Sequence, residues 1–416
     1  MKIGILLWEL DIAGGTQRQA LCLARELSHM GDEVTVYCLK ADPGKCYPEI
    51  MSSLRVEVLK DRVRYNETAS GPIPPFGRRF TGNDMETRYN RRIADLLPED
   101  MDLLNVHDYT VYPAAYFWKK RTGRPVVWMM NDIPWLLDSS WRRGRPWKVL
   151  LRLLSGKEWV RRRHCAYVRS FESVLVLDQR DRDKLFESAG KESMPVVSGL
   201  DLETFPFHPR TAPSGDRPFR ILSNAIFYPH RRLEDIVAAL EILHRQGFDF
   251  HWTHIGTDVR DRLYAERIYR DVARSGLSPF VEFLGEVSED RLCSCFGEAD
   301  AFVFPNTPQS WGLAVFQAMA SGTPVIVSRG SGAARLLTAG KNAILVDPFS
   351  PAQIADALET LKKQGTFWQL LHMEGRRFVE RHVRWDLYAK TLREVFFHVI
   401  GKASSVPEKV SASGWS

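Results

Sequence analysis

Two adjacent glycines, Gly14 and Gly15, stand between an apolar run and a helix-like segment near the start of the chain. Without side chains they let the backbone approach a ligand closely, and the N–H groups at the start of a helix bind anions. Thr16 is expected to cap this helix. A tight turn between a strand and a helix would use the same residues, so a binding loop and a plain turn both remain open.

A histidine follows another apolar run, LLNV. His107 and Asp108 come directly after it, and Asn131 and Asp132 follow the run VVWMM. If both runs are parallel strands, these polar pairs lie at the same sheet edge, where ligands bind in α/β proteins. His107 can then bind a hydroxyl group or orient a reacting group. A purely structural histidine is the alternative.

Two arginines, Arg231 and Arg232, follow the run FRILSNAI and precede a helix-like segment. A guanidinium pairs with phosphate oxygens in a fork geometry, and the N–H groups of the helix start add to the attraction. A solvated first turn is the plainer interpretation, but basic side chains oppose the helix dipole at that end. This unfavourable placement of basic side chains at a helix start favours an anionic ligand there, such as a pyrophosphate.

The segment FVFPNTPQSWGLAVFQAMASGTPVIVS is the most informative for a ligand site, because a strand end, a helix cap and a glycine lie close together in it. A strand is expected to end before its polar stretch, and Ser310 is expected to cap a helix over residues 311–320. The backbone N–H groups of Trp311, Gly312 and Leu313 would then point toward a ligand. Gly312 would keep that approach open.

Short apolar runs alternate with helix-like segments, which is typical of parallel strands buried on both faces. Strands are expected at residues 3–8, 34–39, 103–106, 126–130, 174–177, 221–226, 250–255, 281–284, 301–304, 325–327 and 344–346. Helices are expected at residues 16–29, 233–243 and 354–361, besides the one at 311–320. The alternation predicts an α/β fold with doubly wound sheets.

The alternation restarts once. Residues 201–217 are polar, rich in proline and without periodicity, and a new strand follows. We therefore expect an N-terminal Rossmann-like domain over 1–205, a linker at 206–217 and a C-terminal Rossmann-like domain over 218–385. A helix at 386–401 is expected to pack on the first domain, and the polar residues 402–416 are expected to be disordered.

The composition of the 416 residues, 44% hydrophobic and 26% charged, excludes fibrous, collagen-like and disordered proteins. No stretch reaches the roughly 18 apolar residues of a membrane-spanning helix. The start, MKIGILLWEL, is interpreted as a first strand and not a signal peptide, because acidic residues follow at once. The six cysteines lack zinc-type spacing, so we expect reduced thiols in a cytoplasmic protein.

Most of the positive charge is local. The net charge is +6, yet ten basic residues and one acidic residue lie between positions 142 and 169. Together with the tryptophans and leucines there, they resemble a basic amphipathic helix at an anionic bilayer. The docking candidates are Arg142, Arg143, Arg145, Trp147, Lys148, Arg152, Arg161, Arg162 and Arg163. A core helix with a solvated basic face and an anion-binding acceptor site are alternatives. Nucleic-acid binding is not expected, because no nucleic-acid module accompanies the charge.

These segments together resemble the retaining glycosyltransferases of family 4, the group 1 glycosyl transferases with the GT-B architecture. The similarity runs from MKIGILL and GGTQRQALCLARELSHMGDEVTVY to AILVDPFSPAQIADAL, and WGLAVFQAMASGTPVIVS is its most diagnostic stretch. The resemblance implies two Rossmann-like domains facing across a cleft and a nucleoside diphosphate-sugar donor. It implies no metal and no other cofactor.

The resemblance also implies roles for individual residues. The glycine loop lies near the acceptor and the donor phosphates, His107 contacts the transferred sugar, and a basic pair in the second domain neutralises the diphosphate. Two glutamates, eight positions apart, bind the sugar and the ribose. Transfer retains the anomeric configuration through front-face attack, with the leaving diphosphate as the base. Such a reaction requires positioning and charge stabilisation more than a protein nucleophile.

This sequence departs from the family pattern. Gln309 and Gln317 replace the two glutamates, Ile226 replaces the first basic residue, and Arg335 stands where a later glutamate is expected. Glutamine still forms hydrogen bonds but loses the charge-assisted contact with a diol, which costs about 1–2 kcal/mol per site. Arg232 and Arg335 are candidates to replace the charge missing at Ile226.

We therefore predict an enzyme of polysaccharide and cell-envelope synthesis, peripheral to the inner face of the cytoplasmic membrane. It would transfer a hexose from a nucleoside diphosphate-sugar to a glycan or lipid-linked acceptor. Predicted catalytic residues are His107 and Gln309, and predicted donor-binding residues are Gly14, Gly15, Arg231, Arg232, Ser310, Gly312, Leu313 and Gln317. One alternative is a GT-B-fold protein that binds or regulates without turnover. Another is a GT-B enzyme of a different class, such as a sugar-nucleotide 2-epimerase or a phosphorylase.

Overall fold

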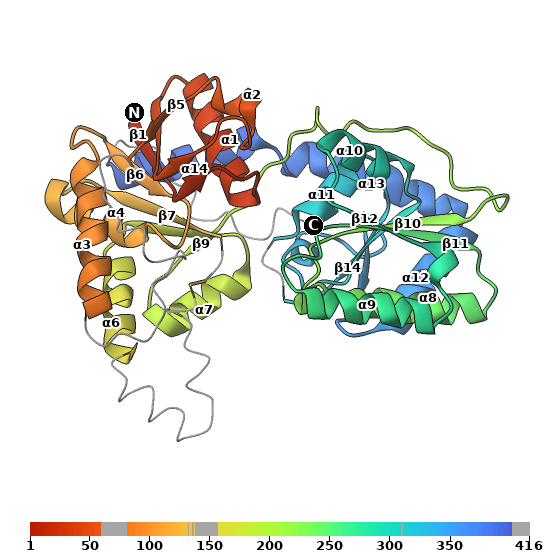
Figure 1. Ribbon diagram of the computed structural model, residues 1–416. Coiled ribbons are helices and arrows are strands. Elements are labelled where there is room, and N and C mark those ends of the chain that lie inside the picture. The colour runs from red at the N-terminus through yellow and green to blue at the C-terminus, as the bar shows by residue number, and fades with distance from the viewer. Residues whose placement is uncertain (60–80, 132, 135–136, 138–156, 309–310, 402–416) are drawn as a thin grey trace. The chain divides into compact units, whose positions relative to one another are not determined.

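The computed structural model describes residues 1–59, 81–131, 133–134, 137, 157–308 and 311–401. The chain forms two compact units, with boundaries between Ser198 and Gly199 and between Arg384 and Trp385. Unit 1 combines the N-terminal half with the helix that follows Arg384, and unit 2 is the segment between (Figure 1). The predicted disordered tail, 402–416, lies outside the described residues.

Unit 1 is built on a parallel sheet of seven strands. Their spatial order is β5 (Arg55–Val58), β3 (Glu33–Cys38), β1 (Lys2–Leu6), β6 (Leu103–Val106), β7 (Val126–Met130), β8 (Ser173–Val176) and β9 (Met194–Pro195). Two further short strands, β2 (Glu9–Leu10) and β4 (Lys40–Ala41), pair with each other. The strand order changes direction between β1 and β6. In open α/β sheets, ligands bind beside the carboxyl ends of the strands at such a switch point.

Helices cover both faces of this sheet. One face carries α1 (Gly15–His29), α2 (Pro48–Met51) and α14 (Trp385–Val399), and the other carries α3 (Thr81–Leu96), α4 (Tyr112–Thr122), α6 (Lys157–Arg169) and α7 (Gln179–Ala189). Successive strand residues alternate between the two cores, so Ile5 packs with α1 and Leu6 with α4. Tyr388 and Leu392 of α14 are fully buried in the α1 core, which makes this helix an integral part of unit 1.

Unit 2 repeats the same design with six parallel strands. Their order is β12 (Val281–Gly285), β11 (Phe250–Ile255), β10 (Phe219–Asn224), β13 (Ala301–Phe304), β14 (Val325–Ser328) and β15 (Ile344–Val346). Figure 1 shows α8 (Leu233–Arg245), α9 (Arg262–Arg274) and α12 (Pro351–Lys363) on one face and α10 (Glu289–Glu298), α11 (Leu313–Ala320) and α13 (Gly365–His382) on the other. The switch point of this sheet lies between β10 and β13. Short 3-10 turns, η3 (Pro229–Arg231), η4 (Ser278–Phe280) and η5 (Ala333–Arg335), occur in the connections.

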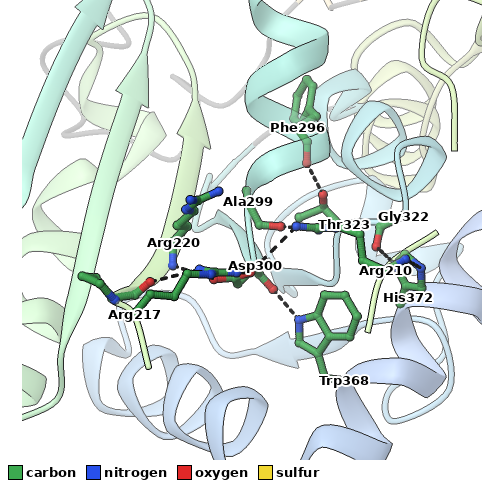
Figure 2. A network of polar contacts seen from close by, with 11 residues as sticks. Arg210, Arg217, Arg220, Phe296, Ala299, Asp300, Gly322, Thr323, Trp368 and His372 are labelled. Carbon is green, nitrogen blue, oxygen red and sulfur yellow. Dashed lines mark hydrogen bonds and ion pairs between the residues drawn. The ribbon is translucent and has the colours of Figure 1, made fainter. Parts of the chain in front are cut away.

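Residues 206–217, the predicted linker, belong to unit 2, and Figure 2 shows Arg210 and Arg217 of this segment beside Asp300. The Arg217 guanidinium donates to both carboxylate oxygens of Asp300 at 2.6 and 2.8 Å. Arg210 donates to the carbonyl oxygen of Ala299 at 2.6 Å, and the indole N–H of Trp368 donates to that of Asp300 at 2.7 Å. These contacts fix the segment that leads into β10.

The predicted α/β class with two doubly wound parallel sheets is confirmed. Each of the eleven predicted strands is present, with ends that differ by at most two residues. All six cysteines are free. Among the described residues, no helix has the length and apolar character needed to span a membrane.

Candidate functional site

The strand-end residues of unit 1 meet at its switch point. Asn131, directly after β7, donates through its side-chain amide to the Thr16 hydroxyl at 3.1 Å and to the His107 carbonyl oxygen at 3.3 Å. It therefore joins the ends of β6 and β7 to the start of α1. The predicted cap at Thr16 is wrong, because Gly14 is the N-cap of α1 and the Thr16 hydroxyl accepts the hydrogen bond from Asn131 instead.

His107 is fully buried at the end of β6. Its backbone N–H donates to the carbonyl oxygen of Leu6 at 3.0 Å, and its Nε2 lies 2.7 Å from Oδ1 of Asn105. Burial lowers the pKa of His107 to about 3, so the ring is neutral at physiological pH. A neutral, immobilised imidazole suits hydrogen bonding to a substrate rather than donation of a proton from imidazolium.

The neighbouring Asp108 shapes the loop between β6 and α4. Its carboxylate accepts hydrogen bonds from the backbone N–H groups of Trp8, Thr110 and Val111, at 2.5, 2.7 and 3.2 Å. Burial raises the pKa of this carboxyl, and the N–H donors act in the opposite direction. Asp108 is therefore a structural residue of the site. Its predicted counterpart Asp132 lies outside the described residues.

The switch point of unit 2 brings Arg231 next to Asn306. Arg231 ends the turn η3 after β10, and Asn306 is a buried residue just after β13. With the Asn306 amide oriented by its hydrogen bonds, its oxygen accepts from Nη1 of Arg231 at 2.9 Å and its nitrogen donates to the Arg231 carbonyl oxygen at 3.2 Å. The backbone N–H of Thr307 donates to the carbonyl oxygen of His230 at 2.8 Å. Burial and the adjacent Arg231 charge lower the pKa of His230 to about 4.

Arg232 has a different environment from Arg231. It is the N-cap of α8 with a left-handed backbone (φ 56°), and its guanidinium donates to the Asp235 carboxylate at 3.0 and 2.7 Å and to Glu234 at 2.6 Å. The guanidinium also lies 4.5 Å from the ring centre of Phe349. Two carboxylates already compensate its charge, so Arg232 is a poor candidate for binding an anionic ligand.

The helix of the diagnostic segment starts later than predicted. α11 begins at Leu313, with Gly312 as its N-cap at φ 112°, so Trp311 precedes the helix. A Cβ at Gly312 would lie 3.1 Å from the Phe304 ring and 3.2 Å from Cβ of Ala333. The helix expected over 311–320 therefore starts two residues too early. The Trp311 carbonyl oxygen lies outside the helix and accepts a hydrogen bond from the backbone N–H of Ala333, the first residue of η5, at 2.9 Å.

The remaining predicted donor residues are only partly described. Gln309 and Ser310 lie outside the described residues. Gln317 is nearly buried on α11, with 7% of its surface exposed, and Leu313 is the first residue of that helix. Arg335 is exposed at the end of η5 and lies beyond β14 in the chain.

Of the membrane-docking candidates, Arg142, Arg143, Arg145, Trp147, Lys148 and Arg152 lie outside the described residues. On α6, Arg161 does not fit this role, because it is buried and donates to both carboxylate oxygens of Glu158 at 2.9 and 2.7 Å. Arg162 is exposed, and Arg163 lies 5.2 Å from the ring centre of the exposed Trp159.

Two site residues were missed by sequence reasoning. Asn306 follows β13 as His107 follows β6, so the strand-end rule would have found it. Asn105 is a lone polar residue inside an apolar strand, two positions before His107 and on the same side of the strand. Within the described residues, no cluster of three or more histidine, cysteine, aspartate or glutamate side chains is arranged to hold a metal ion.

Both units match known sequence families. Residues 13–192 match the family described as Glycosyltransferase Family 4, and residues 219–364 match Glycosyl transferases group 1. A D-inositol 3-phosphate glycosyltransferase of Streptomyces bingchenggensis is 30% identical over 404 residues, which cover 92% of this chain and 84% of the relative. A phosphatidyl-myo-inositol mannosyltransferase of Mycobacterium leprae is 23% identical over 423 residues, covering 98% and 99%.

Solved structures share the fold over nearly the whole chain. A glycosyltransferase from Rickettsia africae has a TM-score of 0.73 at 14% identity, covering 97% of this chain and 99% of its own. Anabaena HepE, solved with UDP and glucose, has a TM-score of 0.69 at 15% identity, covering 95% and 99%. These similarities establish the two-sheet GT-B architecture.

Proposed function

Because the chain belongs to glycosyltransferase family 4, whose members are retaining hexosyltransferases with nucleotide-sugar donors, we propose that it transfers a hexose to a glycan or lipid-linked acceptor. Two of the relatives are named for glycosyl transfer to phosphatidyl-myo-inositol and to D-inositol 3-phosphate. They support a polyol phosphate or its lipid as the acceptor class for this chain.

The contact between Arg231 and Asn306 is the observation that carries the donor assignment. It holds a guanidinium at the carboxyl edge of β10 and β13, where phosphate groups bind in doubly wound sheets. Arg231 would bind the diphosphate in a charge-assisted contact and stabilise the charge that develops on it as the leaving group. The start of α11 at Gly312 and Leu313 would supply backbone N–H groups, with Gln309, Ser310 and Gln317 as the other donor contacts.

In unit 1, His107 would contact the sugar as a neutral hydrogen-bonding group. Gly14 and Gly15, at the start of α1, would lie near the phosphates and the acceptor. A retaining transfer then needs the acceptor hydroxyl and the anomeric carbon held close together, with the leaving diphosphate as the base. No step in this scheme requires a protein nucleophile.

Binding without turnover is the second candidate function. Gln317 is uncharged and nearly buried on α11, at a position where the family pattern has a carboxylate. If the glutamine weakens the donor contact enough, the chain would bind a nucleotide-sugar without transferring the sugar. A 2-epimerase, the third possibility, would convert a nucleotide-sugar in the absence of any acceptor.

One experiment separates these functions. The full chain is titrated by calorimetry with a panel of UDP-, GDP- and ADP-sugars, and release of the nucleoside diphosphate is measured with inositol phosphate and phosphatidylinositol as acceptors. Release that depends on the acceptor supports transfer. Binding without release under all acceptors supports the binding protein, and a new sugar nucleotide formed without acceptor supports the epimerase.

The basic segment is proposed as a docking surface for an anionic membrane, at the inner face of the cytoplasmic membrane. Membrane docking requires exposed basic and aromatic side chains, and Arg162 and Trp159 on α6 are exposed. Each basic residue near an anionic membrane contributes about 1 kcal/mol to the free energy of binding. Flotation with vesicles containing anionic lipid tests the proposal. A bound fraction that is lost at high salt is expected, and no bound fraction at low salt would exclude docking.

A further inference from the structure

We propose that Asn105 is a positioning residue that locks His107 in the tautomer with hydrogen on Nε2, so that Nδ1 accepts a hydrogen bond from a hydroxyl group of a sugar substrate. The inference rests on the proposed transferase function and makes it more specific. It predicts the direction of a hydrogen bond, and it assigns a role to a residue within the sheet.

The orientation of the Asn105 amide is fixed by β7. Nδ2 of Asn105 donates to the carbonyl oxygen of Val127, 3.0 Å away on the neighbouring strand. A carbonyl oxygen only accepts, so the amide nitrogen must face Val127 and the amide oxygen must face the other way. That oxygen lies 2.7 Å from Nε2 of His107. Both side chains are fully buried, so bulk solvent does not compete for these two contacts.

The amide oxygen in turn fixes the imidazole. It can only accept, so Nε2 of His107 carries the hydrogen. Burial keeps the ring neutral, and the single proton is already on Nε2. Nδ1 is therefore an acceptor with a free lone pair. It is buried and has no hydrogen-bond partner among the described residues.

A second acceptor lies on the neighbouring residue of the site. Asn131 uses its amide nitrogen for Thr16 and for the His107 carbonyl oxygen, and its Oδ1 is also buried without a partner in the described part of the chain. Two acceptors at one sheet edge repel phosphate oxygens, which are acceptors as well. They can accept hydrogen bonds from hydroxyl groups, which are numerous on sugars and inositols.

The first test reads the tautomer without any turnover. Long-range ¹H–¹⁵N NMR is recorded on the full chain with ¹⁵N-labelled histidine, and the His107 ring is assigned by its loss in His107→Gln. We expect a protonated Nε2 and an unprotonated Nδ1 that do not titrate between pH 6 and pH 8. In Asn105→Ala we expect a mixture of tautomers, and in Asn105→Asp the original one. A protonated Nδ1 in the wild type would overturn the inference, whether or not the chain is a transferase.

The second test reads the direction of the hydrogen bond to substrate. The donor sugar and the acceptor are each replaced by monodeoxy and monodeoxyfluoro analogues, because fluorine cannot donate a hydrogen bond. At one hydroxyl position we expect hydrogen and fluorine to lower kcat/KM by a similar factor, about tenfold or more. The analogue set that shows this effect identifies whether the donor sugar or the acceptor binds Nδ1.

Asn105→Ala should lower kcat/KM for the parent substrate but change it little for the sensitive deoxy analogue, and Asn105→Asp should restore part of this difference. Asn342→Ala is the matched control, since Asn342 is a buried asparagine of unit 2 that binds the Thr338 backbone. Asn342→Ala should leave the ratio of kcat/KM between the parent substrate and the deoxy analogue unchanged. Activity retained by every fluoro analogue would overturn the inference while leaving the proposed function intact. If no turnover occurs, a sugar nucleotide that binds without shifting the Nδ1 resonance would also overturn it.

Discussion

The carboxylate of Asp300 binds the guanidinium of Arg217 through two hydrogen bonds, of 2.6 and 2.8 Å, at the start of β13. The same carboxylate accepts from the backbone N–H of Arg220 at 2.9 Å, and Arg210 lies 3.8 Å away (Figure 2). β13 carries Asn306 beyond its other end. The ion pair therefore anchors the strand that positions the proposed diphosphate site.

Asp300→Asn should destabilise the protein by about 2–3 kcal/mol. The substitution keeps the shape of the side chain but removes its negative charge. It also places an amide N–H₂ group, itself a donor, next to the N–H donors of Arg217 and Arg220. Urea unfolding measures the loss. Arg245→Ala is the control, because its ion pair with Glu241 is exposed and should contribute less than about 1 kcal/mol. Equal effects of the two substitutions would contradict the role of Asp300.

Arg231→Met and Arg232→Met should act on different properties. We expect Arg231→Met to raise the Kd for a nucleoside diphosphate by about 10- to 100-fold, since a hydrogen bond to a charged group contributes about 1.5–3 kcal/mol. Arg232→Met should change this Kd less than about threefold, because Glu234 and Asp235 occupy its guanidinium. Calorimetry measures both. A larger loss of binding for the Arg232 variant would reverse the assignment.

Gly15→Ala should preserve stability and impair activity. A Cβ at Gly15 meets nothing within 4 Å, and alanine is favoured over glycine in helices by up to about 1 kcal/mol. We expect an unchanged or higher free energy of unfolding and at least a tenfold fall in kcat/KM, because the methyl group occupies space that a ligand needs.

Gly312→Ala serves as the contrast, since its φ of 112° strains any other residue by about 1–3 kcal/mol. It should lower both stability and donor affinity. Full activity of Gly15→Ala would remove the glycine loop from the binding site.

Acid should destabilise the protein through buried histidines. Burial lowers the pKa of His107, His164 and His254 to about 3, well below the ordinary 6.5. The unfolded chain takes up protons below pH 6.5 and the folded one does not, so stability is complete above pH 6.5 and falls as the pH drops toward 3.

His254→Asn removes one of these groups, a fully buried residue of β11 whose Nδ1 lies 2.8 Å from the Ser223 hydroxyl oxygen. The wild type should lose about 2 kcal/mol more than this variant between pH 7 and pH 5, measured by urea unfolding at each pH. Parallel pH dependences of the two proteins would show that His254 titrates normally in the folded state.

Strands were the most predictable part of the fold. Central parallel strands are buried on both faces, and their apolar runs are readable without any other information. β5 and β9 were missed because edge strands are short and less apolar, and β2 and β4 have only two residues each. For α14 the sequence predicted a helix that packs on the first domain, but not its partner α1, because that contact joins the two ends of unit 1.

The sequence predicted where the candidate site residues lie relative to strands and helices, but not which other residues they contact. The sequence predicted that His107 follows a strand and that Arg231 follows a strand and a turn, and the structure has them directly after β6 and in η3. The sequence did not reveal that Arg232 is engaged by Glu234 and Asp235, because ion pairs depend on backbone direction. The helix start at Leu313 was misplaced because a left-handed Gly312 as N-cap cannot be distinguished from a helical glycine in the sequence.

The anomeric configuration of the product tests the account most directly. The wild-type chain is incubated with an α-linked nucleoside diphosphate-hexose and an inositol phosphate or lipid acceptor, and the isolated glycoside is examined by ¹H NMR. We predict an α-linked product formed together with one equivalent of nucleoside diphosphate, and a strongly reduced rate for Arg231→Met. A β-linked product, or donor binding with no transfer to any acceptor, would contradict a retaining glycosyltransferase.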